Sequence, residues 1–330
     1  MVERDFLSVI SLTEATVDTL GNQKLKLMKL ILACLFLLNA LCRGDILYVA
    51  NIGDNTVYKV NEAGARTLFA SNPFSSGGVA LDTSGNVYWG HFGAGYIEKF
   101  STSGASSVFA NLSQPTSIAC YGGDVYVATF YSDTITKISQ AGVKTVFANT
   151  NSGLYRPAGM EFDANGNLYV ANEFASNILK ITLSGVATVV GRVQRPEDVA
   201  IDSSGNIFAS DFINNRIQKI TPGGTVTTFA SGLNTPYGLA FDSAGFLYEA
   251  DAGSGSIFKF DFSGNRSAFA TGFSLPRDLT FQVVPEPLVA AILLLGLGTL
   301  LKGRPSAKPE RHERVGPKIE TLPAEDRTSP

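Results

Sequence analysis

The pentapeptide Leu-Tyr-Val-Ala-Asn stands at residues 47–51 and again at residues 168–172, and this stretch decides the fold. Variants of it are VYWGH at 87–91, VYVAT at 125–129, IFASD at 207–211 and LYEAD at 247–251. The aromatic residue in second place recurs every 38 to 43 residues, at Tyr48, Tyr88, Tyr126, Tyr169, Phe208 and Tyr248. Short β-branched and aromatic runs at such a period are typical of propeller blades. The sequence therefore predicts an all-β protein of six repeats.

Each repeat carries signals for four strands. A first strand begins near a proline, as at Pro157, and ends at a turn such as Asp163–Asn167. Aspartate at the start of such a turn accepts backbone N–H bonds, and glycine takes the positive φ that a tight hairpin needs. The pentapeptide is the second strand. A third strand ends in a lysine followed by an apolar residue, as in Lys180-Ile181, and a fourth follows a glycine turn.

The combined pattern, Pro-x-Gly-apolar-Ala-x-Asp, Gly-Asn-x-Tyr-Val-Ala and Asn-x-Ile-x-Lys-Ile, resembles NHL repeats over residues 45–282. The resemblance implies a six-bladed β-propeller. The first repeat lacks a first strand, because Asp45 leads directly into the pentapeptide, whereas Pro276–Gln282 is a first strand without a repeat of its own. We expect this segment to complete blade one. Closing the ring would remove the free sheet edges between the first and last repeats.

The first strands alternate in side-chain size. Small residues such as Gly238 and Ala240 stand at every second position, and large ones such as Leu239 and Phe241 stand between them. Because strand side chains alternate between the two faces of a sheet, each blade should press bulky residues onto the smooth face of its neighbour.

Residues 1–44 read as an upstream extension followed by a signal peptide. The twelve apolar residues Leu30–Leu41 follow Lys24, Lys26 and Lys29, and the run is shorter than the roughly 20 residues of a membrane-spanning helix. We expect this signal helix to be cleaved near Cys42 or Gly44, with Met28 as the true start. The protein would then be exported.

Residues 283–304 resemble a PEP-CTERM sorting signal of Gram-negative bacteria. The motif Pro285-Glu286-Pro287 precedes the apolar run Leu288–Leu301 and the basic residues Lys302 and Arg304. The resemblance implies an exosortase-like processing enzyme as a partner, and a hydrophobic C-terminal helix that holds the protein at the membrane transiently. We then expect it at the cell envelope or extracellular surface. A plain membrane anchor is the alternative, and residues 305–330 are charged and proline-rich, which predicts disorder.

Charge and cysteine content exclude two classes of protein. A net charge of −3 gives no electrostatic reason to expect a nucleic-acid partner. Cys120 is the one cysteine of residues 45–282, so an internal disulfide cannot form there.

Two sets of loops should open on one face of the ring, namely those that lead into the first strands and those that follow the second strands. Functional residues concentrate on loops of a rigid scaffold, which makes this the candidate ligand-binding face. Asp198 and Asp278 replace glycine there, and Glu161 replaces an alanine of other blades. Turn capping and mutual ion pairs are the structural alternative for these carboxylates. The candidate residues are Asp198, Asp278, Glu161, Glu197, Arg277, His91, Phe92, Phe130 and Phe212.

Three propeller families suggest different functions. Gluconolactonase-like propellers hold a divalent metal with a Pro-Asn-Gly step, but here the step reads Pro-Ala-Gly at Pro157 and Pro-Tyr-Gly at Pro236. Virginiamycin B lyase-like propellers need a histidine beside acidic ligands, and His91 is the only histidine of residues 45–282. We therefore favour a non-catalytic surface or matrix module without metal or cofactor, whose ligand is a glycan, a protein or a small molecule. A metal-dependent hydrolase or lyase is the alternative.

Export makes a first prediction. In a Gram-negative host, the mature protein should begin within a few residues of Cys42, because a basic flank and a short apolar run mark a cleaved signal. Peptide mass spectrometry of the fractionated cell would show the new N-terminus. Recovery of the intact 330-residue chain from the cytosol would contradict the prediction.

Overall fold

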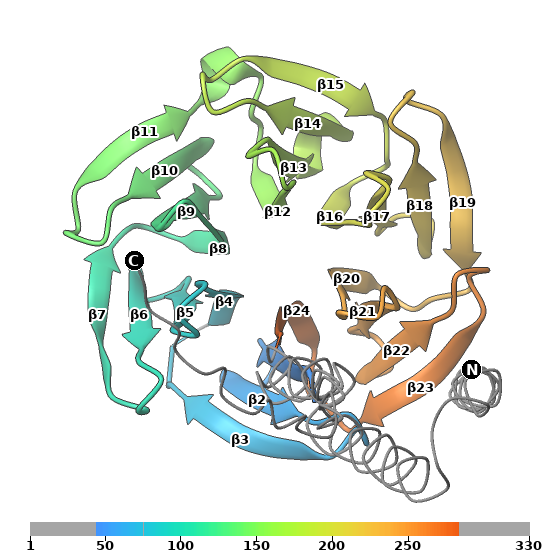
Figure 1. Cartoon of the computed structure of the whole chain (residues 1–330), viewed down its shortest axis with the longest axis horizontal. Coiled ribbons are helices and arrows are strands. Elements are labelled where there is room, and N and C mark those ends of the chain that lie inside the picture. Colours follow the sequence, from blue (N-terminus) through green and yellow to red (C-terminus); the bar gives the residue numbers. More distant parts are fainter. Residues whose placement is uncertain (1–43, 75, 284–330) are drawn as a thin grey trace, which may run out of the picture. The chain divides into compact units, whose positions relative to one another are not determined.

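A computed structural model describes residues 44–74 and 76–283, and these form six antiparallel four-stranded sheets around a central axis (Figure 1). The expected six-bladed β-propeller is confirmed. The expected signal helix, the hydrophobic C-terminal helix and the tail lie outside the described residues. Within them, no helix combines the length and apolar character needed to cross a bilayer.

The blades follow one another along the chain, with strands given from the axis outward. Blade one is β24 (Pro276–Gln282), β1 (Ile46–Asn51), β2 (Thr56–Val60) and β3 (Arg66–Ser71); blade two is β4 (Ser76–Leu81), β5 (Val87–His91), β6 (Tyr96–Phe100) and β7 (Ser106–Asn111). Blade three is β8 (Pro115–Tyr121), β9 (Asp124–Thr129), β10 (Thr134–Ile138) and β11 (Lys144–Ala148); blade four is β12 (Pro157–Phe162), β13 (Leu168–Asn172), β14 (Asn177–Ile181) and β15 (Ala187–Gly191). Blade five is β16 (Pro196–Ile201), β17 (Ile207–Asp211), β18 (Arg216–Ile220) and β19 (Val226–Ser231); blade six is β20 (Pro236–Phe241), β21 (Leu247–Asp251), β22 (Ser256–Phe260) and β23 (Arg266–Thr271).

The recurring tyrosine and lysine of each repeat are partners across two strands. Tyr88 of β5 lies opposite Lys99 of β6, and the lysine Nζ stands 5.2 Å from the centre of the tyrosine ring. Phe109 of the fourth strand meets the same ring edge-on, at 5.1 Å between centroids. The same lysine–aromatic contact occurs in every blade, at 5.0 to 5.7 Å. It adds cation–π attraction and covers the ring with the lysine stem.

The aspartate turns between first and second strands form as the sequence predicts. In blade two, Asp82 Oδ1 accepts hydrogen bonds from the backbone N–H groups of Ser84 and Asn86, at 3.0 and 2.9 Å. Gly85 takes a φ of 82°, which a residue with a Cβ rarely adopts. The turn thereby fixes the register of the strand pair on either side of it.

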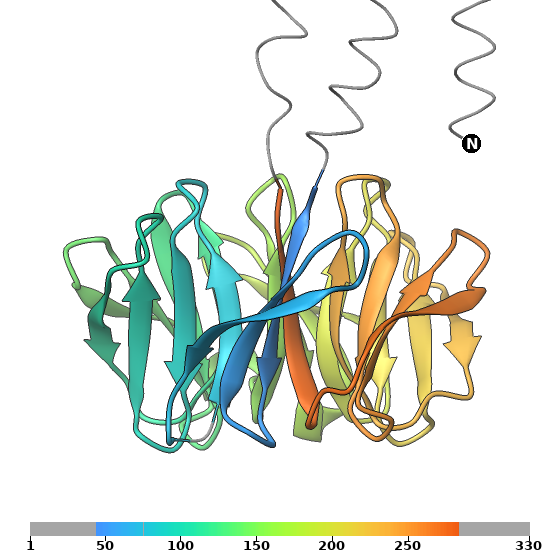
Figure 2. The same ribbon diagram turned by 90° about the horizontal axis from the view of Figure 1, so that it is seen from below.

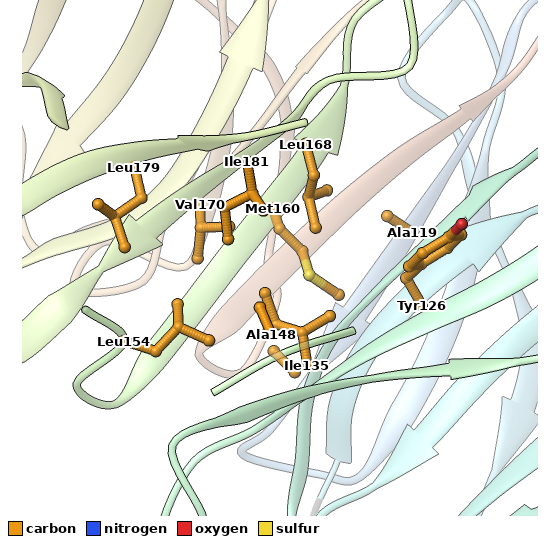
Figure 3. Packing of buried hydrophobic residues seen from close by; sticks show 11 residues of the cluster. Ala119, Tyr126, Ile135, Ala148, Leu154, Met160, Leu168, Val170, Leu179 and Ile181 are labelled. Carbon is orange, nitrogen blue, oxygen red and sulfur yellow. The ribbon is translucent and has the colours of Figure 1, made fainter. Parts of the chain in front are cut away.

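Neighbouring blades pack large side chains against small ones. Met160 of β12 packs on Ala119 and Tyr126 of blade three (Figure 3). Phe162 of the same strand meets the Tyr126 ring edge-on, at 4.7 Å between centroids. Blade six repeats the arrangement, because Leu239 and Phe241 contact Ala200 of blade five in the same way. The prediction of a smooth and a bulky face is confirmed at these two interfaces.

The last strand closes the ring, as the sequence predicts. β24 pairs antiparallel with β1, from Ile46 opposite Gln282 to Ala50 opposite Asp278. Figure 2 shows these two strands, blue and orange-red, side by side. Since Ile46 begins β1 and Gln282 ends β24, the chain joins and leaves the ring at the same side of the disc.

Removing β24 tests the closure. A chain that ends at Leu275 should aggregate and melt at a lower temperature, because β1 becomes a free edge and the inner wall of blade one is lost. A chain that ends at Val283 keeps β24 and is the matched control. Size-exclusion chromatography and thermal denaturation measure the difference, and equal behaviour of the two truncated chains would contradict the closure.

Candidate functional site

The candidate face is the side of the disc opposite the one where the chain joins and leaves the ring. Hairpins between second and third strands form it, together with the connections from each fourth strand to the next first strand. We call this side the loop face. In Figure 2 it is the lower side of the disc.

The backbone of the loop face is held in an unusual conformation. The residue before each first-strand proline takes a positive φ, as at Arg156 (51°), Arg195 (46°) and Thr235 (59°). A side chain of the preceding blade accepts the backbone N–H of this residue: Asp133 Oδ1 bonds Arg156 at 2.6 Å, and Asn215 Oδ1 bonds Thr235 at 3.0 Å. A positive φ costs about 1–3 kcal/mol and persists where its surroundings enforce it. The loops are therefore preorganised.

Aromatic rings gather on the loop face over blades two to four. Phe130 lies 6.4 Å from Phe92, 5.0 Å from Tyr131 and 6.2 Å from Phe174 between ring centroids, and Tyr155 lies 5.7 Å from Phe174. Tyr131, Tyr155 and Phe174 expose 59%, 50% and 44% of their surface. We call these five residues the aromatic patch. Exposed aromatic side chains that gather in this way make the patch a candidate interaction site.

Arg156 stands among the rings of the aromatic patch. Its guanidinium carbon lies 4.1 Å from the centroid of Phe174, 5.1 Å from Phe130 and 5.2 Å from Tyr131. Within the described residues, no carboxylate comes within ion-pair distance of this guanidinium. The patch therefore combines apolar faces with an uncompensated positive charge.

A second group of residues lies on the loop face where blades four to six and blade one contribute. Arg195 Nε stands 2.7 Å from Glu173 Oε1 and 3.5 Å from Glu197 Oε1. The Arg195 guanidinium also lies 4.5 Å from the ring centre of Phe212. We call the group the charged cluster. Its members are Glu173, Arg195, Glu197, Phe212, Tyr237 and Arg277.

Glu197 is a carboxyl group of the charged cluster with a raised pKa. Burial and the nearby charge of Glu173 raise the pKa of Glu197 to about 7, against the opposing effect of Arg277 and Arg195. A carboxyl group with such a pKa exchanges its proton near neutral pH. It is thereby suited to acid–base chemistry as well as to hydrogen bonding.

Three predicted carboxylates lie inside the ring, where each bonds the next blade. Glu161 Oε2 accepts the N–H of Ile201, Asp198 Oδ2 that of Leu239, and Asp278 Oδ2 that of Val79, each at 2.8 Å. Burial raises the pKa of Glu161 to about 8 and that of Asp278 to about 6, although their N–H bonds oppose the shift. Burial, with Asp278 nearby, holds the pKa of Asp198 well above its usual range. These bonds join blades four to five, five to six, and one to two.

Glycines make room for the two aspartates. A Cβ at Gly159 would overlap the Asp198 carboxylate, and a Cβ at Gly78 would lie 2.8 Å from Asp278 Oδ2. Asp198 therefore fills the interface on one side and bonds blade six on the other. In the sequence, aspartate replaces glycine at this position in two blades. In the structure, each of these aspartates lies against a glycine of an adjacent blade, where a Cβ would not fit.

A cavity of about 330 Å³ occupies the central channel. Glu161, Asp198 and Asp278 line it, and it extends past Phe281 to Val283, towards the side where the chain leaves the ring. The three carboxylates thus belong to the channel and not to the loop face. Among the residues that the structure describes, no three His, Cys, Asp or Glu side chains converge in a way that could hold a metal ion.

His91 lies inside blade two. Its side chain is fully buried between the rings of Trp89 and Tyr96, each 4.3 Å away, and its Nε2 stands 3.1 Å from Glu98 Oε2. Burial lowers its pKa. Its counterpart Asn172 is likewise buried, and accepts the backbone N–H of Tyr155 at 2.7 Å. Residues at this position shape the loops from within and do not present side chains to a ligand.

The structure therefore divides the residues predicted from the sequence. Phe92 and Phe130 belong to the aromatic patch, and Glu197, Arg277 and Phe212 to the charged cluster. The sorting motif Pro285–Pro287 lies outside the described residues. From the sequence, Arg156 and Arg195 were expected to join Asp198 and Asp278 in a charged funnel, but the structure has the two aspartates in the channel and the two arginines on the loop face. Sequence reasoning did not select Tyr131, Tyr155, Phe174 or Tyr237 as site residues.

Comparisons with known proteins give the fold. The chain matches no protein-family model and no curated protein sequence. It is similar to a chain in the crystal structure of a nidogen–laminin complex, with a TM-score of 0.67 and 20% identity over 73% of this chain and 99% of that one. It is also similar to virginiamycin B lyase from Staphylococcus aureus, with a TM-score of 0.52 and 17% identity over 72% of this chain and 81% of the lyase chain. A third similar structure is that of the calcium-binding protein regucalcin from Agrobacterium tumefaciens. Its TM-score is 0.56, with 19% identity over 64% of this chain and 79% of the regucalcin chain.

The buried carboxyl groups predict a pH dependence of stability. A carboxyl whose pKa is higher in the folded than in the unfolded state stabilises the protein at low pH, and this contribution is lost as the pH rises towards the folded pKa. For Glu161, with a folded pKa of about 8, the loss extends from acidic pH to about pH 8. The free energy of unfolding should fall by about 2 kcal/mol between roughly pH 6.5 and 8. Burial lowers the pKa of His91, so its opposing contribution rises with pH and is nearly complete about one pH unit above the ordinary histidine pKa.

Glu161→Gln tests the assignment by denaturant titration at both pH values. The amide still accepts the Ile201 N–H but does not ionise, so the variant should lose less stability than the wild type as the pH rises. Glu62, which is exposed, provides the matched control as Glu62→Gln. Equal pH profiles for Glu161→Gln and the wild type would show that Glu161 does not titrate in this range.

Proposed function

We propose that the protein is an exported, non-catalytic binding module that holds its ligand on the loop face. The observation that carries the proposal is the aromatic patch with Arg156. Five aromatic residues and a cation without a carboxylate partner among the described residues lie on loops whose backbone is fixed by bonds between blades. Preorganised aromatic and arginine side chains contribute most to binding at protein surfaces.

The use of the channel carboxylates also supports a binding module. Glu161, Asp198 and Asp278 each accept a backbone N–H of the next blade. The raised pKa values of Glu161 and Asp198 favour their protonated forms at neutral pH, and a divalent cation would have to displace these protons. These groups are better suited to joining blades than to coordinating a catalytic metal.

The two chain ends support export and surface display. The apolar run at Leu30–Leu41 and the Pro285-Glu286-Pro287 motif flank the propeller on either side in sequence. We propose that a signal peptidase removes the first and that an exosortase-like enzyme acts at the second. The protein would then reach the cell envelope or extracellular surface after a transient stay at the membrane.

A hydrolase or lyase is the second candidate function, and one observation favours it. Glu197, with a pKa of about 7, lies 3.5 Å from Arg195 and shares the charged cluster with Tyr237. A carboxyl group near neutrality beside cationic donors can exchange a proton with a substrate. The similarity to virginiamycin B lyase extends to the fold, at 17% identity.

Ligand binding tests the first proposal. Once a glycan, protein or small-molecule screen has identified a ligand, Phe130→Ala and Phe212→Ala should each weaken it roughly tenfold, about 1.4 kcal/mol. The reason is that each change removes a ring from the loop face. Phe262→Ala is the matched control, because Phe262 is also exposed but lies on the opposite side of the disc, stacked on Phe246. Isothermal titration calorimetry gives the affinities.

An enzyme would behave differently. Stoichiometric calcium or zinc in the purified protein, with lactonase or lyase activity lost in Asp198→Asn, would overturn the binding module in favour of a metal-dependent enzyme. Activity that persists without metal and is lost in Glu197→Gln would instead place acid–base chemistry in the charged cluster. Equal affinities of the wild type and both phenylalanine variants would exclude the loop face as the binding surface.

A further inference from the structure

We propose that Arg156 and the aromatic patch form a subsite for a uronic acid residue of an anionic polysaccharide. The proposal rests on the loop face being the binding surface and adds the chemistry of the ligand. Two properties of the patch carry it. One is a guanidinium group that lacks a carboxylate partner among the described residues, and the other is a set of exposed rings within reach of the same ligand.

The charge of Arg156 is available to a ligand. The arginine at the equivalent position in the next blade, Arg195, is held at 2.7 Å by Glu173 and at 3.5 Å by Glu197. The acidic residue beside Arg156 is Asp133, whose Oδ1 accepts the main-chain N–H of Arg156 and not its guanidinium. A guanidinium presents N–H donors in a planar fork that matches the two oxygens of a carboxylate. Arg156 is therefore suited to bind an incoming carboxylate.

The rings explain why the carboxylate should belong to a sugar. A pyranose ring is apolar on its C–H face and polar at its edge. A flat aromatic ring can therefore pack against the C–H face while a nearby donor bonds the polar groups at the edge. Phe174, Phe130 and Tyr131 lie 4.1 to 5.2 Å from the Arg156 guanidinium. One uronate residue can then stack on a ring and place its carboxylate on Arg156. Binding sites commonly join an apolar lining to a few well-placed polar groups in this way.

The position of the patch favours a polysaccharide over a peptide. Extended peptides commonly bind by adding a strand to a sheet edge. In the described part of the chain, the outer strands of the blades, such as β11 and β15, provide the sheet edges, and these run along the circumference of the disc (Figure 1). The loop face offers side chains from hairpins instead, and the patch continues from Phe92 of blade two to Phe174 of blade four. A linear polymer can contact several of these rings along its length.

Polygalacturonate and its methyl ester test the proposal with the full-length protein. The ester keeps the sugar ring and removes only the negative charge. We expect polygalacturonate or alginate to bind the wild type, Arg156→Gln to weaken that binding roughly tenfold or more, and methyl esterification of polygalacturonate to have a similar effect. Arg156→Lys keeps the charge without the planar fork and should retain part of the affinity. Affinity electrophoresis and calorimetry measure the affinity of each protein variant for each polysaccharide.

Arg266→Gln is the matched control. Arg266 lies 4.7 Å from the ring of Phe258 in blade six, a similar arginine–aromatic contact away from the loop face, so its loss should leave polysaccharide binding unchanged. Equal binding of Arg156→Gln and the wild type, equal binding of the acid and the ester, or no binding of either acidic polymer would overturn the uronate subsite. If a different ligand still depends on Phe130 and Phe212, the loop face remains the binding surface and only the uronate chemistry fails.

Discussion

The pairing of β24 with β1 is the constraint on which the rest of the structure depends. Blade one is assembled from the two ends of the folded chain, so this blade is not complete until the whole propeller has been made. Once the ring is closed, the first strand of every blade lies beside the first strands of the two neighbouring blades. Asp278 shows what this achieves, because its strand is the last in the sequence and yet it bonds Val79 of blade two. Closure therefore makes the interface between blades one and two equivalent to the others, and it creates the channel.

The interfaces between blades combine apolar packing with a small number of polar bonds. The interfaces between blades three and four and between blades five and six set large side chains against alanine. Three of the six interfaces contain a carboxyl group that accepts a neighbour's N–H. A buried polar group is tolerated when it is hydrogen-bonded, and it penalises alternative pairings in which the bond is lost. Glu249 of β21 is an exception within the described chain, because it is fully buried and neither of its oxygens has a hydrogen-bond partner. Burial holds the pKa of Glu249 well above its usual range, so its neutral form is the one that the blade accommodates.

The fold could be predicted almost entirely from the sequence, because each blade repeats the same local signals. Tyr88, Lys99 and the turn at Asp82 recur at fixed intervals, and the displaced strand Pro276–Gln282 indicated how the ring closes. The candidate site was harder to predict, because period-two alternation does not show how deep a side chain lies. Asp198 and Asp278 stand at loop-proximal positions in the sequence, yet a bulge after the strand's proline in blade five and in blade one brings these residues into the channel. Arg156 was underestimated, because its contacts with Phe130 and Phe174 are made between loops of the neighbouring blades three and four, and strand periodicity does not show contacts between loops.

The side on which the chain joins and leaves the ring has a consequence for how the molecule is displayed. Ile46 and Gln282 are partners in one strand pair, and the aromatic patch lies on the far side of the disc. Any attachment made through either end of the chain, whether a natural tether or an affinity tag, pulls on the same side. The disc would then be oriented with the side opposite the loop face towards the support and the aromatic patch towards the medium. The height of the disc would separate the attachment from the aromatic patch, and the orientation would not depend on which end is used.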